Sequence, residues 1–349
     1  TMALRRGAWQ EAFTLVGEMQ QGGLEPDVVT RNAMVSALER AGRWGRALQV
    51  LEEMWRAGTA PSVVTYGAAI RACERGRQWE GAVRLVEEMS ESGIRPNLVT
   101  YNSAISACEK AHQWEWALLL FADLRQKLLA PDVITYSSTI SALGQSHLWE
   151  HAMHLFAQLR RTRRLAADVV AYSAAISALG RGMQWQRSLH LLLEMRESSL
   201  ETNLVACSAA VSACEICERW EQALSLVGHL QAAGQEPNAI VVSAAVSACE
   251  KCAQWEVALR AVGEVSRGRL QPHVVTYDTL LAACSRGREW GQVLRVVGDM
   301  ERMGFEPTVD TYQAALTACE GLARPGRMPS LLAEVQHRAP QLFEHIGTK

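Results

Sequence analysis

The sequence lacks an excess of charge of either sign and any long apolar run. Its 349 residues carry a formal net charge of −2, so no global basic field draws the chain to nucleic acid non-specifically. No window approaches 18 uninterrupted apolar residues, so we expect no membrane span. The chain opens at Thr1 without a leading Met or a signal-like segment, from which we expect a truncated start.

Motifs of the common enzyme classes are missing as well. The sequence contains no GxSxG, no GxxxxGK[S/T] and no GxGxxG placed after a strand. Carboxylates recur in one column, which indicates a solvated helix end rather than a two-metal cluster: Glu39, Glu74, Glu109, Glu215 and Glu250. We therefore predict that the chain is not an enzyme and that it needs no cofactor.

Aromatic residues are scarce, yet the tryptophans follow a fixed period. Nine of the eleven step by 35 residues, with one step of 36: Trp9, Trp44, Trp79, Trp114, Trp149, Trp185, Trp220, Trp255 and Trp290. Self-similarity at one period is the signature of a solenoid. We predict a partial repeat (1–27), eight repeats and a divergent C-terminal repeat or cap (309–349), the eight being 28–62, 63–97, 98–132, 133–168, 169–203, 204–238, 239–273 and 274–308.

Each repeat is predicted to form a helical hairpin. In repeat 98–132, small and apolar residues have helical spacing over 100–110, and Trp114 to about Gln126 repeats the i, i+3, i+4, i+7 pattern. Pro131 then ends the second helix. One hairpin cannot cover its own apolar face, so neighbours must stack. The predicted fold is all-α, a right-handed α-solenoid superhelix.

The cysteines raise the question of a metal site. Their odd number favours reduced thiols over a disulfide framework. Cys214 with Cys217, and Cys249 with Cys252, have a CxxC spacing typical of zinc ligands. Most cysteines, however, share one column of the repeat, where we expect buried small residues: Cys73, Cys108, Cys214, Cys249, Cys284 and Cys319. We favour packing over zinc.

A histidine cluster invites the same suspicion. His147 falls in a predicted turn, and His151 and His154 share a face of the helix that follows. The spacing is not HExxH, and no third ligand column exists. We expect a solvated surface and predict no metal.

Two columns suit contacts with a ligand. The second residue of each repeat is β-branched, which fits either packing between first helices or a contact role: Val29, Val64, Val99, Ile134, Val170, Val205, Ile240 and Val275. The second column is basic, which fits either phosphate contacts or ordinary C-terminal helix capping: Arg40, Arg75, Lys110, Arg181, Lys251 and Arg286. The sequence leaves both questions open.

Two further columns vary among short polar residues. The fifth residue of each repeat is Asn32, Gly67, Asn102, Ser137, Ser173, Ser208, Ser243 and Asp278. The last residue is Ser62, Asn97, Asp132, Asp168, Asn203, Asn238, His273 and Thr308. Hydrogen-bonding side chains that change from repeat to repeat are what reading different base edges requires.

The pattern VVTYNxxISACxKxxxWExALxLxxEMxxxGxxPD resembles the P-type repeats of pentatricopeptide repeat (PPR) proteins, and its tryptophan-rich form resembles those of protists and algae. Its period separates it from the 34-residue tetratricopeptide repeat. The resemblance covers nearly the whole chain. It implies an organellar protein of the chloroplast or mitochondrion that binds single-stranded RNA as a monomer, one nucleotide per repeat, and works beside RNA-processing enzymes in RNA processing, stability or translation.

The resemblance also implies roles for single residues. In that family the fifth and last residues together select the base, and the β-branched residue helps to sandwich it. The pairs imply cytosine for Asn32–Ser62, uracil for Asn102–Asp132, guanine for Ser137–Asp168, and adenine for Ser173–Asn203 and Ser208–Asn238. The pairs Gly67–Asn97, Ser243–His273 and Asp278–Thr308 depart from the pattern. The predicted core is 5′-CNUGAA-3′.

Two other functions remain open at this stage. A protein-interaction scaffold of the tetratricopeptide type would use the groove for peptide and give the polar pairs no role. The second alternative is that the chain is the RNA-recognition part of an RNA-processing enzyme whose catalytic domain is absent from this sequence.

Overall fold

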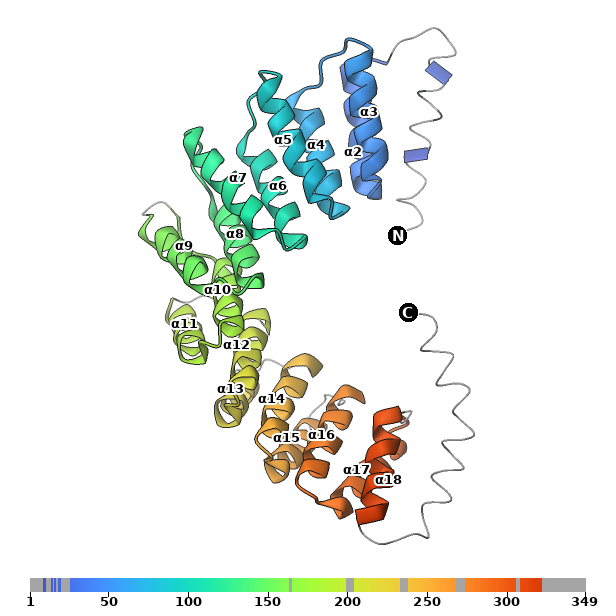
Figure 1. The fold of residues 1–349 in the computed structure, drawn as a ribbon, viewed down its shortest axis with the longest axis vertical. Coiled ribbons are helices and arrows are strands. Elements are labelled where there is room, and N and C mark those ends of the chain that lie inside the picture. Colours follow the sequence, from blue (N-terminus) through green and yellow to red (C-terminus); the bar gives the residue numbers. More distant parts are fainter. Residues whose placement is uncertain are drawn as a thin grey trace. The chain divides into compact units, whose positions relative to one another are not determined.

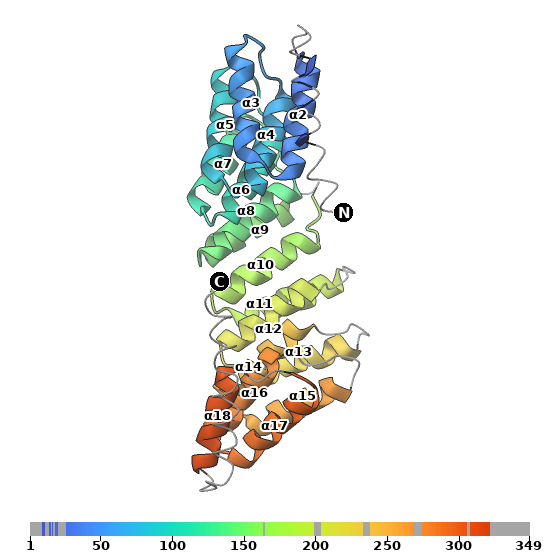
Figure 2. The same ribbon diagram turned by 90° about the vertical axis from the view of Figure 1, so that its right-hand side faces the viewer.

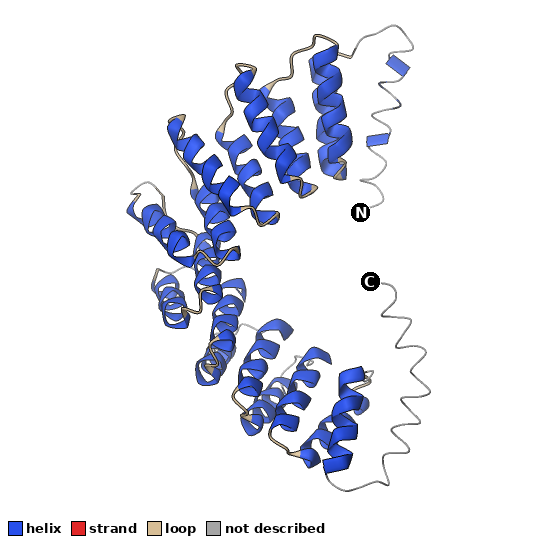
Figure 3. Cartoon of the chain, viewed as in Figure 1, coloured by secondary structure: helices blue, strands red, loops and turns tan. Residues whose placement is uncertain are grey.

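The computed structural model describes residues 26–162, 165–198, 204–232, 238–267, 274–305 and 308–321, with a few residues between 9 and 19. Every regular element in this part is an α-helix, and no strand occurs there (Figure 3). None of its helices is long and apolar enough to cross a membrane. The predicted all-α fold is confirmed.

Helices alternate between the first and the second helix of a repeat. The first helices are α2 (Val28–Ala41), α4 (Val63–Arg75), α6 (Leu98–Lys110), α8 (Val133–Gln145), α10 (Val169–Arg181), α12 (Leu204–Ile216), α14 (Ala239–Lys251), α16 (Val274–Arg286) and α18 (Val309–Gly321). The second helices are α3 (Trp44–Arg56), α5 (Trp79–Glu91), α7 (Trp114–Gln126), α9 (Trp149–Arg161), α11 (Trp185–Glu197), α13 (Trp220–Ala232), α15 (Trp255–Arg267) and α17 (Trp290–Arg302). Each described second helix thus begins at a tryptophan of the period.

The chain divides into two compact units, Thr1–Gly182 and Met183–Lys349. Within the first unit, α2, α4, α6, α8 and α10 pack side by side in chain order (Figures 1 and 2). Each second helix packs against the first helix of its own repeat and against that of the next repeat. The second unit repeats this arrangement with α12, α14, α16 and α18. Each unit is therefore an α-solenoid.

The turn inside each hairpin follows one rule. After α6, His112 takes a left-handed conformation with φ 59°, and the N–H of Gln113 donates to the carbonyl of Cys108 at 2.9 Å. Residues with positive φ stand at the same place in the other described turns: Gly42, Arg77, His147, Met183, Glu218, Ala253 and Arg288. The bonds satisfy carbonyls that a helix end leaves free.

The core consists of columns of small side chains between larger apolar ones. An alanine recurs at the fourth position of several second helices and is fully buried, with Ala47, Ala82 and Ala117 as examples. The described cysteines of the predicted column are also fully buried, which confirms that prediction: Cys73, Cys108, Cys214, Cys249 and Cys284. Small residues at these places let neighbouring helices approach closely.

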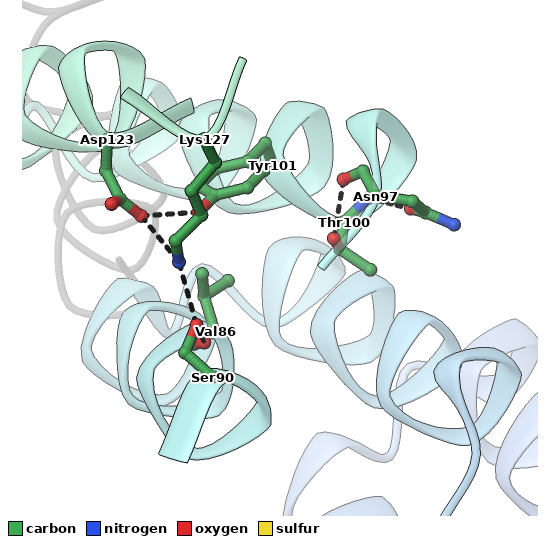
Figure 4. A network of polar contacts seen from close by, with 7 residues as sticks. All are labelled: Val86, Ser90, Asn97, Thr100, Tyr101, Asp123 and Lys127. Atoms are coloured by element: carbon green, nitrogen blue, oxygen red, sulfur yellow. Dashed lines mark hydrogen bonds and ion pairs between the residues drawn. The ribbon is translucent and has the colours of Figure 1, made fainter. Parts of the chain in front are cut away.

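Tyrosines at the fourth position of the repeat tie the two helix layers together. The Tyr101 hydroxyl of α6 donates to Asp123 of α7, which also holds Lys127 Nζ at 3.1 Å (Figure 4). Lys127 in turn donates to Ser90 Oγ of α5 at 2.8 Å. Tyr101 is fully buried, and burial raises the pKa of its hydroxyl, so it stays a donor throughout the physiological pH range.

Candidate nucleic-acid interface

The β-branched column lies in the first turn of the first helices and faces solvent. Its members expose between 55% and 71% of their surface: Val29, Val64, Val99, Ile134, Val170, Val205, Ile240 and Val275. Packing between first helices does not explain them, because more than half of the surface of each residue stays open to solvent in the described structure. Each unit therefore carries a row of exposed apolar side chains along the N-terminal ends of its first helices.

The last residue of a repeat is the N-cap of the next first helix. Asp132 Oδ1 accepts from the N–H of Thr135 at 2.8 Å, and Asn238 Oδ1 accepts from the N–H of Val241 at 2.9 Å. The same bond occurs at Ser62, Asn97, Asp168 and Thr308. Capping favours Ser, Thr, Asn and Asp, which gives this column a structural reason to be polar that the sequence interpretation overlooked. Asn203 and His273 lie outside the described residues.

The fifth residue of one repeat meets the cap of the next. Asn102 Nδ2 lies 3.1 Å from both carboxylate oxygens of Asp132, and Asn32 Nδ2 donates to Ser62 Oγ at 3.4 Å. Near the C-terminal end, Thr308 Oγ1 donates to Asp278 Oδ1 at 3.2 Å. At these three boundaries the two variable columns are thus brought together in pairs, beside the exposed β-branched residues.

Serine at the fifth position behaves differently from asparagine. Its hydroxyl turns back and donates to a carbonyl of its own helix, at 2.6 Å from Ser137 to Val133 and at 2.9 Å from Ser208 to Val205. Ser173 and Ser243 form the same kind of bond. Serine therefore leaves more space beside the cap than asparagine does. In each unit, the β-branched residues, the fifth residues and the caps lie at the N-terminal ends of the first helices. We call them together the N-terminal strip.

The basic column lies at the opposite end of the first helices and is largely paired. Lys110 Nζ is 2.7 Å from Glu74 Oε1, and equivalent pairs join Arg75 to Glu39, Lys251 to Glu215 and Arg286 to Glu250, at 3.2 to 3.4 Å. Each pair links a first helix to its neighbour, and we call this series of ion pairs the ladder. These cations keep between 36% and 57% of their side-chain exposure.

The carboxylates of this ladder correct one expectation. Glu39 is buried, at 7% exposure, and side chains of Glu74, Glu215 and Glu250 expose no more than 23%. The predicted solvated helix end is wrong for these four, because each of them lies between two first helices and pairs with a cation 36 residues later. Arg40 and Arg181 have no carboxylate partner among the described residues.

One ion pair of the ladder does not form, the one expected from Glu109 in α6 to α8. Gln145 stands where the next cation belongs, and its buried Oε1 has no hydrogen-bond partner in the described part of the chain. Burial raises the pKa of Glu109, so the folded state binds its proton more tightly than the unfolded state does. This carboxyl therefore makes stability fall as pH rises through the interval between its ordinary pKa and its raised pKa.

Gln145→Lys is expected to supply the missing ion pair with Glu109. It should raise the free energy of unfolding at neutral pH by about 1 kcal/mol, because the partly buried Glu109 carboxylate gains a cation. The gain should vanish at about pH 4, where Glu109 is protonated. Urea unfolding at both pH values measures it, with Gln145→Met as the uncharged control of similar length. An equal gain in the methionine variant would assign the effect to packing.

Family models match the described helices over much of the chain. The PPR repeat family model matches residues 26–75, 61–110 and 96–145. The pentatricopeptide repeat domain model matches residues 260–321, and the PPR repeat model matches residues 134–162 and 170–200. Together these matches cover more than half of the sequence. The chain belongs to the pentatricopeptide repeat family.

Solved structures of this family share the fold. The crystal structure of PPR10 from maize matches with a TM-score of 0.56 and 21% identity, covering 96% of this chain and 57% of PPR10. The structure of PPR10 in complex with an 18-nt psaJ RNA element matches with a TM-score of 0.50 and 24% identity, covering 96% of this chain and 52% of the other. This PPR chain therefore spans little more than half of the protein it resembles. No curated protein matches it.

The surroundings of the cysteines and histidines in this PPR protein do not favour metal binding. Burial raises the pKa of the Cys214 and Cys249 thiols to about 11, so neither readily forms the thiolate that binds zinc. Cys217 Sγ donates to the Met183 carbonyl at 3.3 Å. His147, His151 and His154 are exposed, as predicted. No group of three or more potential ligands occurs among the described residues.

Proposed function

We propose that this PPR chain binds single-stranded RNA sequence-selectively, one nucleotide per repeat, and that it has no catalytic activity of its own. The observation that carries the proposal is the N-terminal strip, in which an exposed β-branched side chain accompanies a polar pair at one repeat after another. A structure of PPR10 contains an 18-nt RNA element, which supports RNA as the ligand of this fold.

The strip has the chemistry to hold a base from two directions. The exposed side chains of Val99 and Ile134, at the start of neighbouring first helices, offer apolar surface to the two faces of a base. Burying such surface is favourable by about 0.8 kcal/mol for each CH₂ group. The polar pair Asn102–Asp132 belongs to the same two helices and meets the edge of that base.

Size and hydrogen bonding assign the bases. Asn102 extends toward its cap and leaves room for a pyrimidine, whereas Ser137 lies against its own helix and leaves room for a purine. An aspartate cap only accepts hydrogen bonds, which suits the ring N–H of uracil and guanine. Asparagine and serine caps also donate, which suits the ring nitrogen acceptors of adenine and cytosine.

Applied along the chain, these rules give 5′-CNUGAA-3′, read from Asn32–Ser62 to Ser208–Asn238. Repeats three and four, with the pairs Asn102–Asp132 and Ser137–Asp168, are proposed to select the uracil and the guanine. In an organelle such a chain would cover a transcript segment. It would thereby act on RNA processing, stability or translation, with RNA-processing enzymes as partners. The paired cations of the ladder, with Arg40 and Arg181, are proposed to meet phosphates at their exposed faces.

Fluorescence anisotropy with labelled RNA tests the proposal. RNA containing CAUGAA is expected to bind at least tenfold more tightly, ~1.4 kcal/mol, than RNA in which UGAA is replaced by ACUU, at each of two salt concentrations. Equal and strongly salt-dependent binding of both RNAs would leave only electrostatic attraction. Absence of binding at low salt would favour a protein-interaction scaffold.

Asn102→Ser is the sharper test. It gives the third repeat a serine beside the Asp132 cap, the combination expected to select guanine, so the preferred third nucleotide should change from uracil to guanine by at least tenfold. The preference for guanine at the fourth nucleotide, read by the unchanged Ser137–Asp168 pair, is the internal control. Retention of uracil in the variant, with the fourth position unaffected, would contradict the assignment of Asn102.

A further inference from the structure

A third residue joins the pair at several repeat boundaries. It is the third residue of the following first helix, three positions after the cap, and its side chain is buried. Thr135 Oγ1 lies 2.6 Å from Asn102 Oδ1, and Thr311 Oγ1 donates to Asp278 Oδ1 at 2.9 Å. Thr65 Oγ1 donates to Asn32 Oδ1 in the same way. Thr65 and Thr135 have no exposed surface at all.

The residue at this place changes with the fifth residue of the preceding repeat. Where the fifth residue is Ser137, Ser173 or Ser208, the later position holds Ala171, Ala206 or Val241, none of which has a hydroxyl. These three are fully buried. Helix capping does not require this change, because Asp168 and Asn238 cap their helices without a threonine hydroxyl.

Two boundaries show what the threonine does without an Asn or Asp to meet. Gly67 precedes Thr100, and the Thr100 hydroxyl turns to the Asn97 carbonyl at 2.7 Å (Figure 4). Ser243 precedes Thr276, whose hydroxyl is buried and has no hydrogen-bond partner among the described residues. Thr276 thus leaves a buried polar group unpaired, which is unfavourable. The threonine therefore matches an amide or carboxylate at the fifth position.

The geometry at Asn102 gives the hydroxyl a directing role. An asparagine amide presents a carbonyl on one side and an N–H₂ group on the other. Asp132 accepts from Nδ2, and the Thr135 hydroxyl, whose oxygen also lies 2.7 Å from Asp132 Oδ1, faces Oδ1 of the amide. Turning the amide over would place its Oδ1 against the Asp132 carboxylate, so that two acceptors meet, and would break the hydrogen bond from the Thr135 hydroxyl. One N–H of Asn102 then remains for a ligand.

We infer that Thr135 is a positioning residue for base selection, and that the third residue of the following helix is a further determinant of specificity in the repeats with a fifth-position asparagine. This inference rests on the proposed function. Thr135 holds the Asn102 amide so that it offers a donor to a carbonyl oxygen of the base. Without the hydroxyl, Asp132 alone orients the amide, which then rotates more freely and offers its acceptor as well.

Thr135→Val tests the inference by removing the hydroxyl at nearly constant volume. The preference for CAUGAA over CAGGAA is expected to fall at least threefold. Thr135→Ser, which keeps a hydroxyl, should retain the preference. The matched control is Thr139→Val in the same helix, because the buried Thr139 hydroxyl donates to the Thr135 carbonyl at 2.7 Å rather than to Asn102 or Asp132.

The ratio of two affinities separates positioning from stability. Thr135 Oγ1 also accepts from the N–H of Asp132 at 3.2 Å, so its loss is expected to lower the unfolding midpoint. Equal weakening of both RNAs would reduce Thr135 to a capping residue and overturn the inference. If the unaltered protein itself shows no preference between CAUGAA and CAGGAA, the proposed function fails and the inference falls with it.

A gain-of-function series tests the same idea in the second unit. Ser208→Asn with Asn238→Asp converts the sixth repeat to the pair that selects uracil, and Val241→Thr adds the hydroxyl. The triple variant is expected to prefer CAUGAU over CAUGAA at least threefold more strongly than the double variant does. An equal preference in both would show that the pair alone is sufficient and would overturn the inference.

Discussion

Alanine at Val64, Val99, Ile134 and Val170 together is expected to weaken RNA binding at least a hundredfold. Each change removes methyl groups that the bound bases would cover, at about 1 kcal/mol for each position. The unfolding midpoint should stay within error, because these side chains expose 55% to 61% of their surface in the free protein. Anisotropy titration and thermal unfolding by circular dichroism measure the two effects.

The control removes apolar surface of similar exposure from elsewhere. Leu119 in α7 and Leu193 in α11 expose 57% and 56%, and both lie in second helices, away from the N-terminal strip. Alanine at both positions should leave RNA affinity unchanged. A hundredfold loss confined to the variant of the β-branched column supports the base sandwich. Unchanged binding of that variant would remove the observation on which the proposed function depends.

Gly144→Ala is expected to destabilise the first unit by about 2 kcal/mol. A Cβ atom at Gly144 in α8 would lie 2.7 Å from the Cβ and 2.9 Å from the Cα of Ala178 in α10. The obstacle is largely backbone, so the two helices must separate, and overpacking of this kind costs about 1–3 kcal/mol. Urea unfolding measures the change in the free energy of unfolding.

Gly45→Ala is the matched control for this prediction. Gly45 lies in the first turn of α3, and, apart from its chain neighbours and the backbone of its own helix, no described atom comes within 4 Å of a Cβ built there. Alanine should therefore stabilise α3 by up to about 1 kcal/mol, through its higher helix propensity. Destabilisation by Gly45→Ala of the same size as that by Gly144→Ala would argue against the close approach of α8 and α10.

The period of the tryptophans was sufficient to predict the hairpins and the buried columns. Cys73 and Ala82 recur at fixed places in the repeat, and in a stack of identical hairpins a fixed place has a fixed environment. The same argument predicted that Val99 and Ile134 form a column, but it left their exposure undecided. Burial depends on whether another helix covers the first turn, and the repeat pattern does not contain that information.

Contacts between repeats were harder to foresee. Glu39 looked solvated because its partners, Arg71 and Arg75, lie on the next first helix. Asp132 looked like a recognition residue alone because its capping bond to Thr135 needs the position of the helix start. The covariation of Asn102 with Thr135, and of Ser137 with Ala171, was present in the sequence. It is recognised only when the fifth residue of one repeat is compared with the third residue of the next first helix, which it contacts in the structure.

The capping role of the last residue also bears on how such arrays change their targets. Asp, Asn and Ser cap helices almost equally well, so exchanging one for another at Asp132 or Asn238 alters the offered donors and acceptors with little effect on folding. The folding requirement restricts the position to a small alphabet, and each member of that alphabet presents a different pattern to a base. Under the proposed code, single substitutions at the cap would thus change specificity while the chain stays folded at every step.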